Sequence, residues 1–365
     1  MRVLYLTNGQ TPHDLRFATA LAGTTHDVHV LSLQGITTGW PEQVHVVHWK
    51  PVKKNWLRVQ LQVPRLKAVI RELAPDVIHA GPLQGPAFLV AAAGAHPLVS
   101  MSWGSDLLLE ATRNLHTRRI TALTLARTDV LVGDSKCILE SARSFGYKDP
   151  YFQFPWGVDL AHFAPGGVTG LRKRLGWQQD TVLLSMRSFE SLYDVDTIVG
   201  AFCQASQVRS DLRLLVYGAG SRESILRRKV EAAGVAEKVH FGGLVGLQEL
   251  PEVYRSADLY VSASHSDGAS VSLMEALACG LPALVSDIPG NREWIEPGVN
   301  GWRFGVGDAE ELSSNFLRFD KDSIQTTEMK ARNRLLAEQR ADWTKNFPIL
   351  LQAYEQAIEL NRGRK

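Results

Sequence analysis

The sequence has few cysteines, little net charge and no long apolar run, and each shortage excludes a class of protein. Three cysteines occur in 365 residues and none forms a CxxC pair, which argues against a disulfide framework and against a zinc site. A formal net charge of +2 gives no strong electrostatic case for nucleic acid. No stretch reaches the ~18 apolar residues of a membrane span, and the first apolar run is too short for a signal peptide. These features predict a cytoplasmic globular protein.

The basic residues that do occur are concentrated in the first half of the chain. They are Lys50, Lys53, Lys54, Arg58, Arg65, Lys67 and Arg71, followed by Arg113, Arg118 and Arg119. Solvated helix faces would explain both clusters without any partner. Alternatively, the clusters form a weakly basic surface that contacts an anionic acceptor or the inner face of a membrane.

Short apolar runs alternate with amphipathic stretches in two successive series. The first series lies at 2–7, 27–33, 44–49, 76–80, 98–103 and 129–135, and the second at 181–187, 212–218, 238–243, 259–264 and 282–287. Runs rich in Val and Leu that lack polar alternation are typical of parallel strands buried on both faces. The alternation with helices predicts an α/β fold of two Rossmann-like, doubly wound domains that face each other across a cleft.

The domain limits follow from the same pattern. We expect an N-terminal domain over 1–165 and a C-terminal domain over 166–341, joined at the Gly/Pro-rich stretch 163–170. The segment 342–365 has a helical apolar pattern but follows no strand, so it is predicted to pack back on the first domain. Pro348 would bend this helix or split it in two.

Residues 265–282 place two carboxylates around a helix start, in the sequence HSDGASVSLMEALACGLP. Asp267 lies in a turn with Gly268, which lets a ligand approach the backbone, and Glu275 lies about one turn inside the helix. The free amides of a helix N-terminus attract anions. An anion, a diol held by Glu275 and further hydroxyls near Asp267 describe a nucleotide-diphosphate sugar. The alternative is a capping box in which Ser272 begins the helix and Glu275 only closes it.

Two further motifs are weaker. Gly218 and Gly220 suggest a nucleotide-binding fingerprint, but the third glycine is missing, so the turn indicates only that a ligand comes near the backbone. Asp194 and Asp196 form a DxD that could hold a divalent metal. Their place at the start of a helical stretch favours helix capping instead.

In combination, these segments resemble the retaining glycosyltransferases of family four, which have the GT-B fold. The resemblance is carried by SDGASVSLMEALACGLPALVSDIPGNREWIEPGVNGW (266–302), PWGVDLAHFAP (155–165), HFGGLVGLQELPEVYRSADLYVSAS (240–264) and the GAG turn. The first domain matches more loosely, through its opening strand and PDVIHAG (75–81). The resemblance implies an enzyme that moves a hexose from a nucleotide-diphosphate sugar, most often a uridine one. Because the sequence offers no credible metal cluster, we expect the enzyme to need no metal or other cofactor. The acceptor would be a glycan, as in polysaccharide biosynthesis, a lipid-linked sugar or a small molecule.

The resemblance also implies a role for each matching residue. Glu275 matches the second acid of the family's E-x7-E motif, which holds the donor ribose, and Asp267 matches the first, which binds hydroxyls of the transferred sugar. Arg187 matches the arginine that grips the diphosphate and stabilises its departure. Further donor contacts are implied for Gly9, Gly218, Gly220, Val245, Gly268, Ala269, Ser270 and Val271.

Two departures from the family pattern lie in the donor domain. Asp267 is shorter than the usual glutamate by one methylene, so the sugar preference cannot be transferred. The lysine expected six residues after Arg187 is replaced by Tyr193, which removes one phosphate-neutralising charge.

A third departure lies in the first domain, where the family often has a histidine at the end of a strand. Trp103 occupies that position here. Asp106 is our candidate for the missing catalytic group, with His79 and His13 as alternatives that also fit structural roles.

Two rival functions remain open from the sequence. A GT-B epimerase or phosphorylase would share the fold, although we find no lysine in a suitable loop for pyridoxal phosphate. A protein that binds nucleotide sugar without transferring it would also fit, because the lysine and the histidine are both missing.

Overall fold

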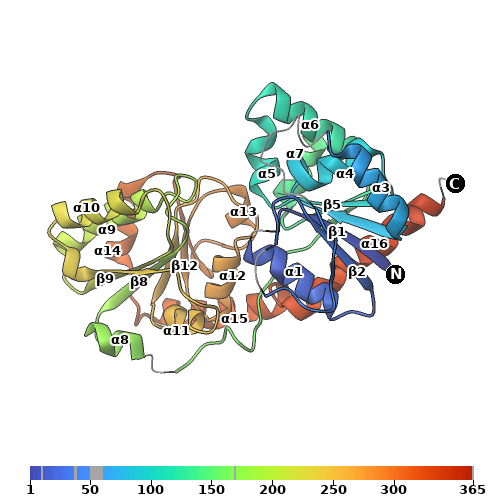
Figure 1. The fold of residues 1–365 in the computed structure, drawn as a ribbon. Coiled ribbons are helices and arrows are strands. Elements are labelled where there is room, and N and C mark those ends of the chain that lie inside the picture. Colours follow the sequence, from blue (N-terminus) through green and yellow to red (C-terminus); the bar gives the residue numbers. More distant parts are fainter. Residues whose placement is uncertain (10, 37–38, 50–60, 168–169, 364–365) are drawn as a thin grey trace. The chain divides into compact units, whose positions relative to one another are not determined.

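The structure is a computed structural model that describes residues 1–9, 11–36, 39–49, 61–167 and 170–363. The chain divides into two compact units (Figure 1). Unit 1 comprises Met1–Pro155 and Phe347–Lys365, and unit 2 comprises Trp156–Asn346.

Unit 1 is built on a parallel sheet of seven strands in the order β3-β2-β1-β4-β5-β6-β7. The strands are β1 (Arg2–Thr7), β2 (Asp27–Ser32), β3 (His45–Val46), β4 (Val77–Ala80), β5 (Leu98–Met101), β6 (Val130–Gly133) and β7 (Tyr151–Gln153). The α-helices are α1 (Pro12–Ala22), α3 (Val63–Leu73), α4 (Phe88–Ala93), α5 (Ser105–Leu108), α6 (Leu115–Ala126), α7 (Lys136–Ser144) and most of α16 (Trp343–Arg362). Two further helical turns lie at Leu83–Ala87 and Glu110–Thr112.

Unit 2 repeats this plan with a parallel sheet of six strands in the order β10-β9-β8-β11-β12-β13. The strands are β8 (Thr181–Met186), β9 (Leu212–Tyr217), β10 (Val239–Gly243), β11 (Leu259–Ser262), β12 (Ala283–Ser286) and β13 (Gly301–Phe304). The helices are α8 (Gly170–Leu175), α9 (Val195–Val208), α10 (Glu223–Ala232), α11 (Leu250–Arg255), α12 (Val271–Ala278), α13 (Pro289–Arg292), α14 (Ala309–Arg318) and α15 (Ile324–Arg340), with a short turn at Ala236–Lys238.

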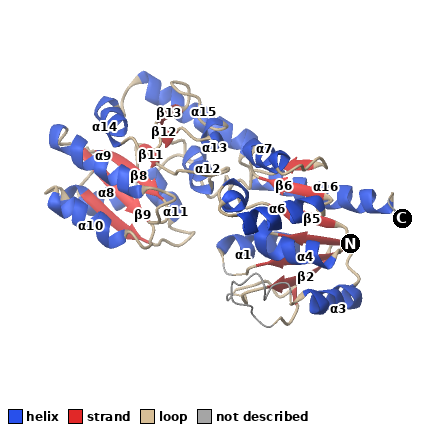
Figure 2. Cartoon of the chain, turned by 90° about the horizontal axis from the view of Figure 1, so that it is seen from above, coloured by secondary structure: helices blue, strands red, loops and turns tan. Residues whose placement is uncertain are grey.

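Each sheet lies between helices, as Figure 2 shows with red strands and blue helices. In unit 2, alternate residues of one strand enter two different apolar layers. Leu184 packs with Leu273 of α12 on one face, and Leu183 packs with Phe202 of α9 and Phe316 of α14 on the other. Burial of both faces accounts for the apolar character of the strands and confirms the predicted two-domain, doubly wound α/β fold.

The C-terminal helix α16 belongs mainly to unit 1, although the strands of unit 2 precede it in the chain. Its Tyr354 hydroxyl lies 2.8 Å from Nδ1 of His79 on β4, and both side chains are fully buried. The His79 ring also stacks on Tyr5 of β1, with centroids 4.7 Å apart. The helix continues through Pro348 and does not divide into two.

The boundary between the units differs from the sequence expectation by about ten residues. Unit 2 begins at Trp156 and not after residue 165, because Val158 and Phe163 are buried in its apolar core. The Gly/Pro-rich stretch 163–170 therefore lies inside unit 2, with residues 168–169 outside the described part of the chain.

Every expected apolar run contains a strand, but β7 and β13 were not anticipated.

Among the residues that the structure describes, no helix combines the length and apolar character that crossing a membrane requires. The basic residues from Lys50 to Arg58 lie outside the described residues.

Candidate functional site

The candidate site lies where the strand order of unit 2 reverses. Strands β8 and β11 pair in parallel at the centre of the sheet, with Leu183 beside Leu259 and Leu184 beside Tyr260. The next strands in the sequence continue outward from β8 on one side and from β11 on the other. Loops at the carboxyl ends of such neighbouring strands form the ligand crevice of open α/β sheets. Arg187 follows β8, and the acidic turn at 265–268 follows β11.

The helix after this turn, α12, begins one residue after Ser270. The Ser270 hydroxyl accepts a hydrogen bond from the amide of Leu273, 3.4 Å away, and so caps the helix. A capping box would therefore need its acid at position 273, where this chain has leucine. Glu275 lies farther inside the helix, so the capping-box interpretation is wrong.

Glu275 instead forms a buried contact with a tyrosine of α11. Its Oε2 accepts a hydrogen bond of 2.6 Å from the hydroxyl of Tyr254, and only 9% of the residue is exposed. Burial, reinforced by the Glu275 charge, raises the pKa of Tyr254 well above its usual value, so this hydroxyl stays protonated and donates. The bond fixes the carboxylate one turn below the start of α12.

Arg187 is held by side chains from two loops. One terminal nitrogen donates to the hydroxyls of Ser270 and Ser272, the latter at 3.1 Å, and the other donates to Asp267. The guanidinium also lies 4.2 Å from the ring centre of Tyr193. Burial by itself lowers the pKa of Arg187, but the carboxylate of Asp267, together with Tyr260 and Tyr193, outweighs it and raises the pKa above its usual range. The arginine is therefore a permanently charged group at the crevice.

Further hydrogen bonds connect the loop after β8 to the loop after β11. The amide of His265 donates to the carbonyl of Leu192 at 2.9 Å, and Nε2 of His265 lies 3.1 Å from Asp194. These contacts hold the two loops together, so that Arg187 and Asp267 lie side by side although they are 80 positions apart in the sequence.

The glycines of the GAG turn serve packing between loops. A β-carbon on Gly218 would collide with the carbonyl of Arg187, and one on Gly220 would collide with that of Phe189. Gly218 also has a φ of +140°, a conformation that side chains disfavour. The two glycines therefore allow the turn after β9 to lie directly against the Arg187 loop, whether or not a ligand is present.

The acids of the DxD motif have protein partners. Asp194 caps α9 by accepting a hydrogen bond from the Thr197 amide, as the sequence favoured. Asp196 forms two hydrogen bonds, of 2.9 and 2.8 Å, with the guanidinium of Arg222. The motif thus joins α9 to the turn before α10.

Asp106, the catalytic candidate of unit 1, is buried and accepts hydrogen bonds from the surrounding backbone. Both of its oxygens accept hydrogen bonds: the amides of Leu83, Trp103 and Leu107 donate at 2.9, 3.0 and 2.9 Å, and the Ser102 hydroxyl donates at 2.7 Å. Burial raises the pKa of Asp106, and these four bonds oppose the shift. The bonds hold together the loop after β5, a role that competes with the catalytic role expected from the sequence.

The two histidine alternatives are both neutral. Burial lowers the pKa of His79 to about 3, and its contacts with Tyr354 and Tyr5 are those of a core residue. Burial, with a smaller contribution from Arg16, lowers the pKa of His13 to about 4. The His13 ring meets that of Trp103 edge to face, with centroids 6.2 Å apart.

The predicted donor contacts divide between the units. Val245, in the loop after β10, packs on the apolar layer beside α12, and Gly268 to Val271 lead directly into that helix. Gly9 belongs to unit 1, where a β-carbon would collide with Ser32 and Gly35, so local packing alone explains this glycine.

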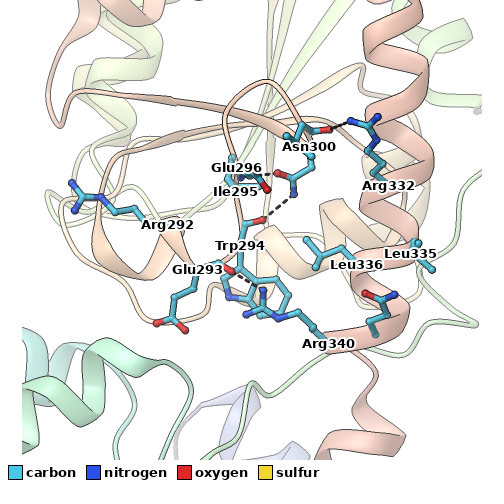
Figure 3. A pocket seen from close by; sticks show the side chains of 12 residues that line it. Arg292, Glu293, Trp294, Ile295, Glu296, Asn300, Arg332, Leu335, Leu336 and Arg340 are labelled. Carbon is cyan, nitrogen blue, oxygen red and sulfur yellow. Dashed lines mark hydrogen bonds between the residues drawn. The ribbon is translucent and has the colours of Figure 1, made fainter.

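A cavity of about 360 Å³ lies elsewhere in unit 2, between the segment from α13 to β13 and helix α15 (Figure 3). Two of the arginines that line it have partners within the protein. Arg340 lies over the ring of Trp294 at 4.4 Å and donates to the carbonyl of Glu293, while Arg292 forms two hydrogen bonds with Asp287. None of the lining residues belongs to the predicted donor site.

Sequence reasoning missed the side chains that hold the motif residues in place. Ser272 and Tyr193 contact Arg187, and Tyr254 binds Glu275. The sequence identified Tyr193 only as the residue that replaces the family's lysine. For Tyr254 the sequence carried no signal, because the contact joins two different helices.

The chain matches two families that describe its two halves. Residues 169–346 match "Glycosyl transferases group 1", and residues 2–135 match "Glycosyl transferase 4-like". The chain belongs to the group 1 glycosyltransferases of the family-four type and is a glycosyltransferase enzyme.

Similar proteins agree with this assignment. A GDP-mannose-dependent monoacylated alpha-(1-6)-phosphatidylinositol monomannoside mannosyltransferase of Corynebacterium glutamicum is 27% identical over 75% of each chain. A D-inositol 3-phosphate glycosyltransferase of Geodermatophilus obscurus is 32% identical, over 40% of this chain and 35% of the relative.

Among solved structures, HepE of Anabaena in complex with UDP is 18% identical and covers 100% of both chains, with a TM-score of 0.79. Sucrose-phosphate synthase of Thermosynechococcus elongatus has a TM-score of 0.81 and 17% identity, over 98% of this chain and 99% of its own. At these identities the two neighbours show the shared fold.

Proposed function

We propose that this enzyme is a retaining glycosyltransferase that takes a hexose from a uridine-diphosphate sugar. The observation that carries the proposal is the arrangement at the switch point of unit 2. A charged arginine, the free amides of a helix N-terminus and a buried carboxylate lie there in succession. The arginine and the amides suit a diphosphate, and the carboxylate suits a ribose diol.

The chemistry follows from these groups. Departure of the diphosphate concentrates negative charge on the leaving oxygen, and Arg187 with the amides at the start of α12 would stabilise it. The leaving phosphate can itself accept the proton of the acceptor hydroxyl. Retention of configuration then needs neither a strong base nor a nucleophile from the protein. This agrees with the hydrogen bonds that Asp106 and His79 form within unit 1, which suit structural roles.

The choice of uridine is supported by solved structures of the Anabaena neighbour in complex with UDP and with UDP-glucose. The Corynebacterium relative is named for GDP-mannose instead. A panel of UDP, GDP and ADP sugars, followed by transfer and by thermal shift, distinguishes these donors. Stabilisation and turnover with a GDP sugar alone would contradict the uridine assignment.

Donor binding is expected to need no divalent metal. Asp194 caps a helix and Asp196 pairs with Arg222, so the acids of the DxD are already engaged. Isothermal calorimetry should give the same UDP affinity with magnesium and with a chelator, to within about the twofold change that 0.4 kcal/mol represents. Loss of binding on chelation would make the DxD a metal site and contradict this part of the proposal.

For the acceptor we propose a glycan or lipid-linked sugar at the cytoplasmic face of the membrane. Arg65, Lys67 and Arg71 of α3 are exposed, as are Arg118 and Arg119 of α6. Exposed leucines accompany the charges, Leu61 before α3 and Leu115 at the start of α6. Basic residues interleaved with apolar ones suit the interface of an anionic membrane. The name of the Corynebacterium relative also describes a phosphatidylinositol-based acceptor.

The membrane proposal predicts salt-dependent binding to anionic vesicles. The protein should co-sediment with phosphatidylglycerol vesicles at low salt and less at physiological salt, because surface charges are screened within about 8 Å there. Arg118→Glu with Arg119→Glu should reduce the bound fraction, while neutral phosphatidylcholine vesicles serve as the control. Failure to bind at low salt would favour a soluble acceptor, since screening could not then be responsible.

A further inference from the structure

The arginine assigned to the donor diphosphate already has an anionic partner. Its terminal nitrogens donate to Asp267, Ser270 and Ser272, and its side chain is only 9% exposed. Among the described residues its Nε has no hydrogen-bond partner, and that atom is buried. A diphosphate that binds these terminal nitrogens therefore competes with the partners that they already have.

Asp267 is engaged at both oxygens as well. One accepts from Arg187, and the other accepts a hydrogen bond of 3.0 Å from the amide of Gly268. The side chain is nevertheless 23% exposed, more than its partner. The acid expected to hold sugar hydroxyls is thus occupied in the ligand-free enzyme, and it is the more accessible member of the pair.

The partners of Arg187 differ in how they respond to a diphosphate. The serine hydroxyls are neutral and can remain in place. The Asp267 carboxylate carries the same sign of charge as the diphosphate, and like charges repel strongly in a partly buried site. Asp267 is therefore the partner that an arriving diphosphate would displace.

The backbone of the acidic turn leaves little room for a larger movement. A β-carbon on Gly290, at the start of α13, would collide with the carbonyl oxygens of Asp267 and Gly268. The amide of His265 binds the Leu192 carbonyl on the other side of the turn. The change open to Asp267 is a rotation of its own side chain.

We propose that Asp267 stands in for the donor diphosphate in the free enzyme. On donor binding the diphosphate takes over Arg187, and the released carboxylate turns to the hydroxyls of the transferred sugar. The inference rests on the proposed function, in which Arg187 binds that diphosphate. It adds that the sugar-binding acid becomes available only once the diphosphate has arrived, so that diphosphate binding and sugar orientation are coupled.

The inference predicts an unusual gain of affinity. Asp267→Asn keeps the size of the side chain but removes the competing charge, so it should bind UDP about tenfold more tightly, equivalent to ~1.4 kcal/mol. Its sugar transfer should nevertheless be slower, because the acid that orients the sugar is lost. A carboxylate that touches only the sugar would instead leave UDP affinity unchanged when it is removed.

Calorimetry with UDP on the full chain tests this, with Asp287→Asn as the matched control. Asp287 also pairs with arginines, Arg292 and Arg303, and follows the neighbouring strand β12, but it does not contact Arg187. Asp287→Asn should leave UDP affinity within about twofold, or ~0.4 kcal/mol, of wild type. The rise in melting temperature that UDP produces should be larger in Asp267→Asn than in wild type, as tighter binding requires.

Equal or weaker UDP binding by Asp267→Asn overturns the inference and leaves the proposed function standing. An equal gain in Asp287→Asn also overturns it, because the effect would then be one of net charge. If Asp267→Asn fails to fold, Asp267→Ala is measured against Asp267→Glu, which keeps the charge, and the alanine variant should bind UDP more tightly. Absence of UDP binding by the wild-type enzyme would reject the uridine donor itself, and the inference with it.

Discussion

Replacement of Arg187 by alanine is expected to reduce sugar transfer by about 10²- to 10³-fold, the usual cost of losing one group that stabilises developing charge. Arg187 follows β8 and bonds to residues just before the start of α12, so its positive charge lies beside the expected diphosphate. Its removal deprives the leaving diphosphate of a fixed positive charge. UDP affinity should fall as well, because free UDP presents the same diphosphate.

The measurement is kcat and kcat/KM with the preferred donor, together with the melting temperature. Arg187→Lys keeps the charge but loses the forked geometry, so its turnover should lie between those of alanine and wild type. Arg292→Ala removes an exposed arginine that follows β12, and it should remain within about twofold of wild type, a barrier change of ~0.4 kcal/mol. A folded Arg187→Ala enzyme with turnover within tenfold of wild type would reject the assigned role.

Much of the fold could be predicted because buried parallel strands leave a clear mark in the sequence. Strands such as β1 and β8 are continuous apolar runs, since helices cover both faces of their sheets. The two strands that were missed lie at sheet edges, where that mark is weak. Strand β7 has three half-buried residues, and β13 begins with Gly301 and carries Arg303. Strand β3 also lies at a sheet edge, and it has two residues where the sequence predicted a strand over 44–49.

The candidate site was predictable as a set of loops but not as a set of contacts. The family resemblance assigned Arg187 and the acidic turn to one donor site, and the pairing of β8 with β11 agrees with it, because it places the ends of these strands side by side. Nothing in the sequence indicates that Arg187 pairs with Asp267, because that contact depends on side-chain conformations across 80 positions of chain. The glycines of the GAG turn illustrate the same limit. Their pattern suggested a ligand near the backbone, and the structure adds that the loop after β8 leaves no room for a side chain at either position.

Glu275→Gln is expected to weaken binding of free UDP and of the intact donor alike. Loss of a charged hydrogen-bond partner costs ~1.5–3 kcal/mol, which corresponds to roughly 10- to 150-fold in affinity. The amide oxygen of glutamine can still accept the hydrogen bond from Tyr254, so the fold and the position of the side chain should be retained. The loss would therefore report on the ribose and not on packing.

Tyr254→Phe is the matched control, because it removes the other half of the same hydrogen bond while leaving the carboxylate in place. It should lower the melting temperature, since Glu275 would lose a buried donor, and it should weaken UDP binding less than Glu275→Gln does. Calorimetry with UDP and with a UDP sugar, alongside thermal melting, separates the two variants. If Glu275→Gln bound UDP as the wild-type enzyme does, the carboxylate would serve to hold α11 against α12, and the ribose would have to be bound elsewhere.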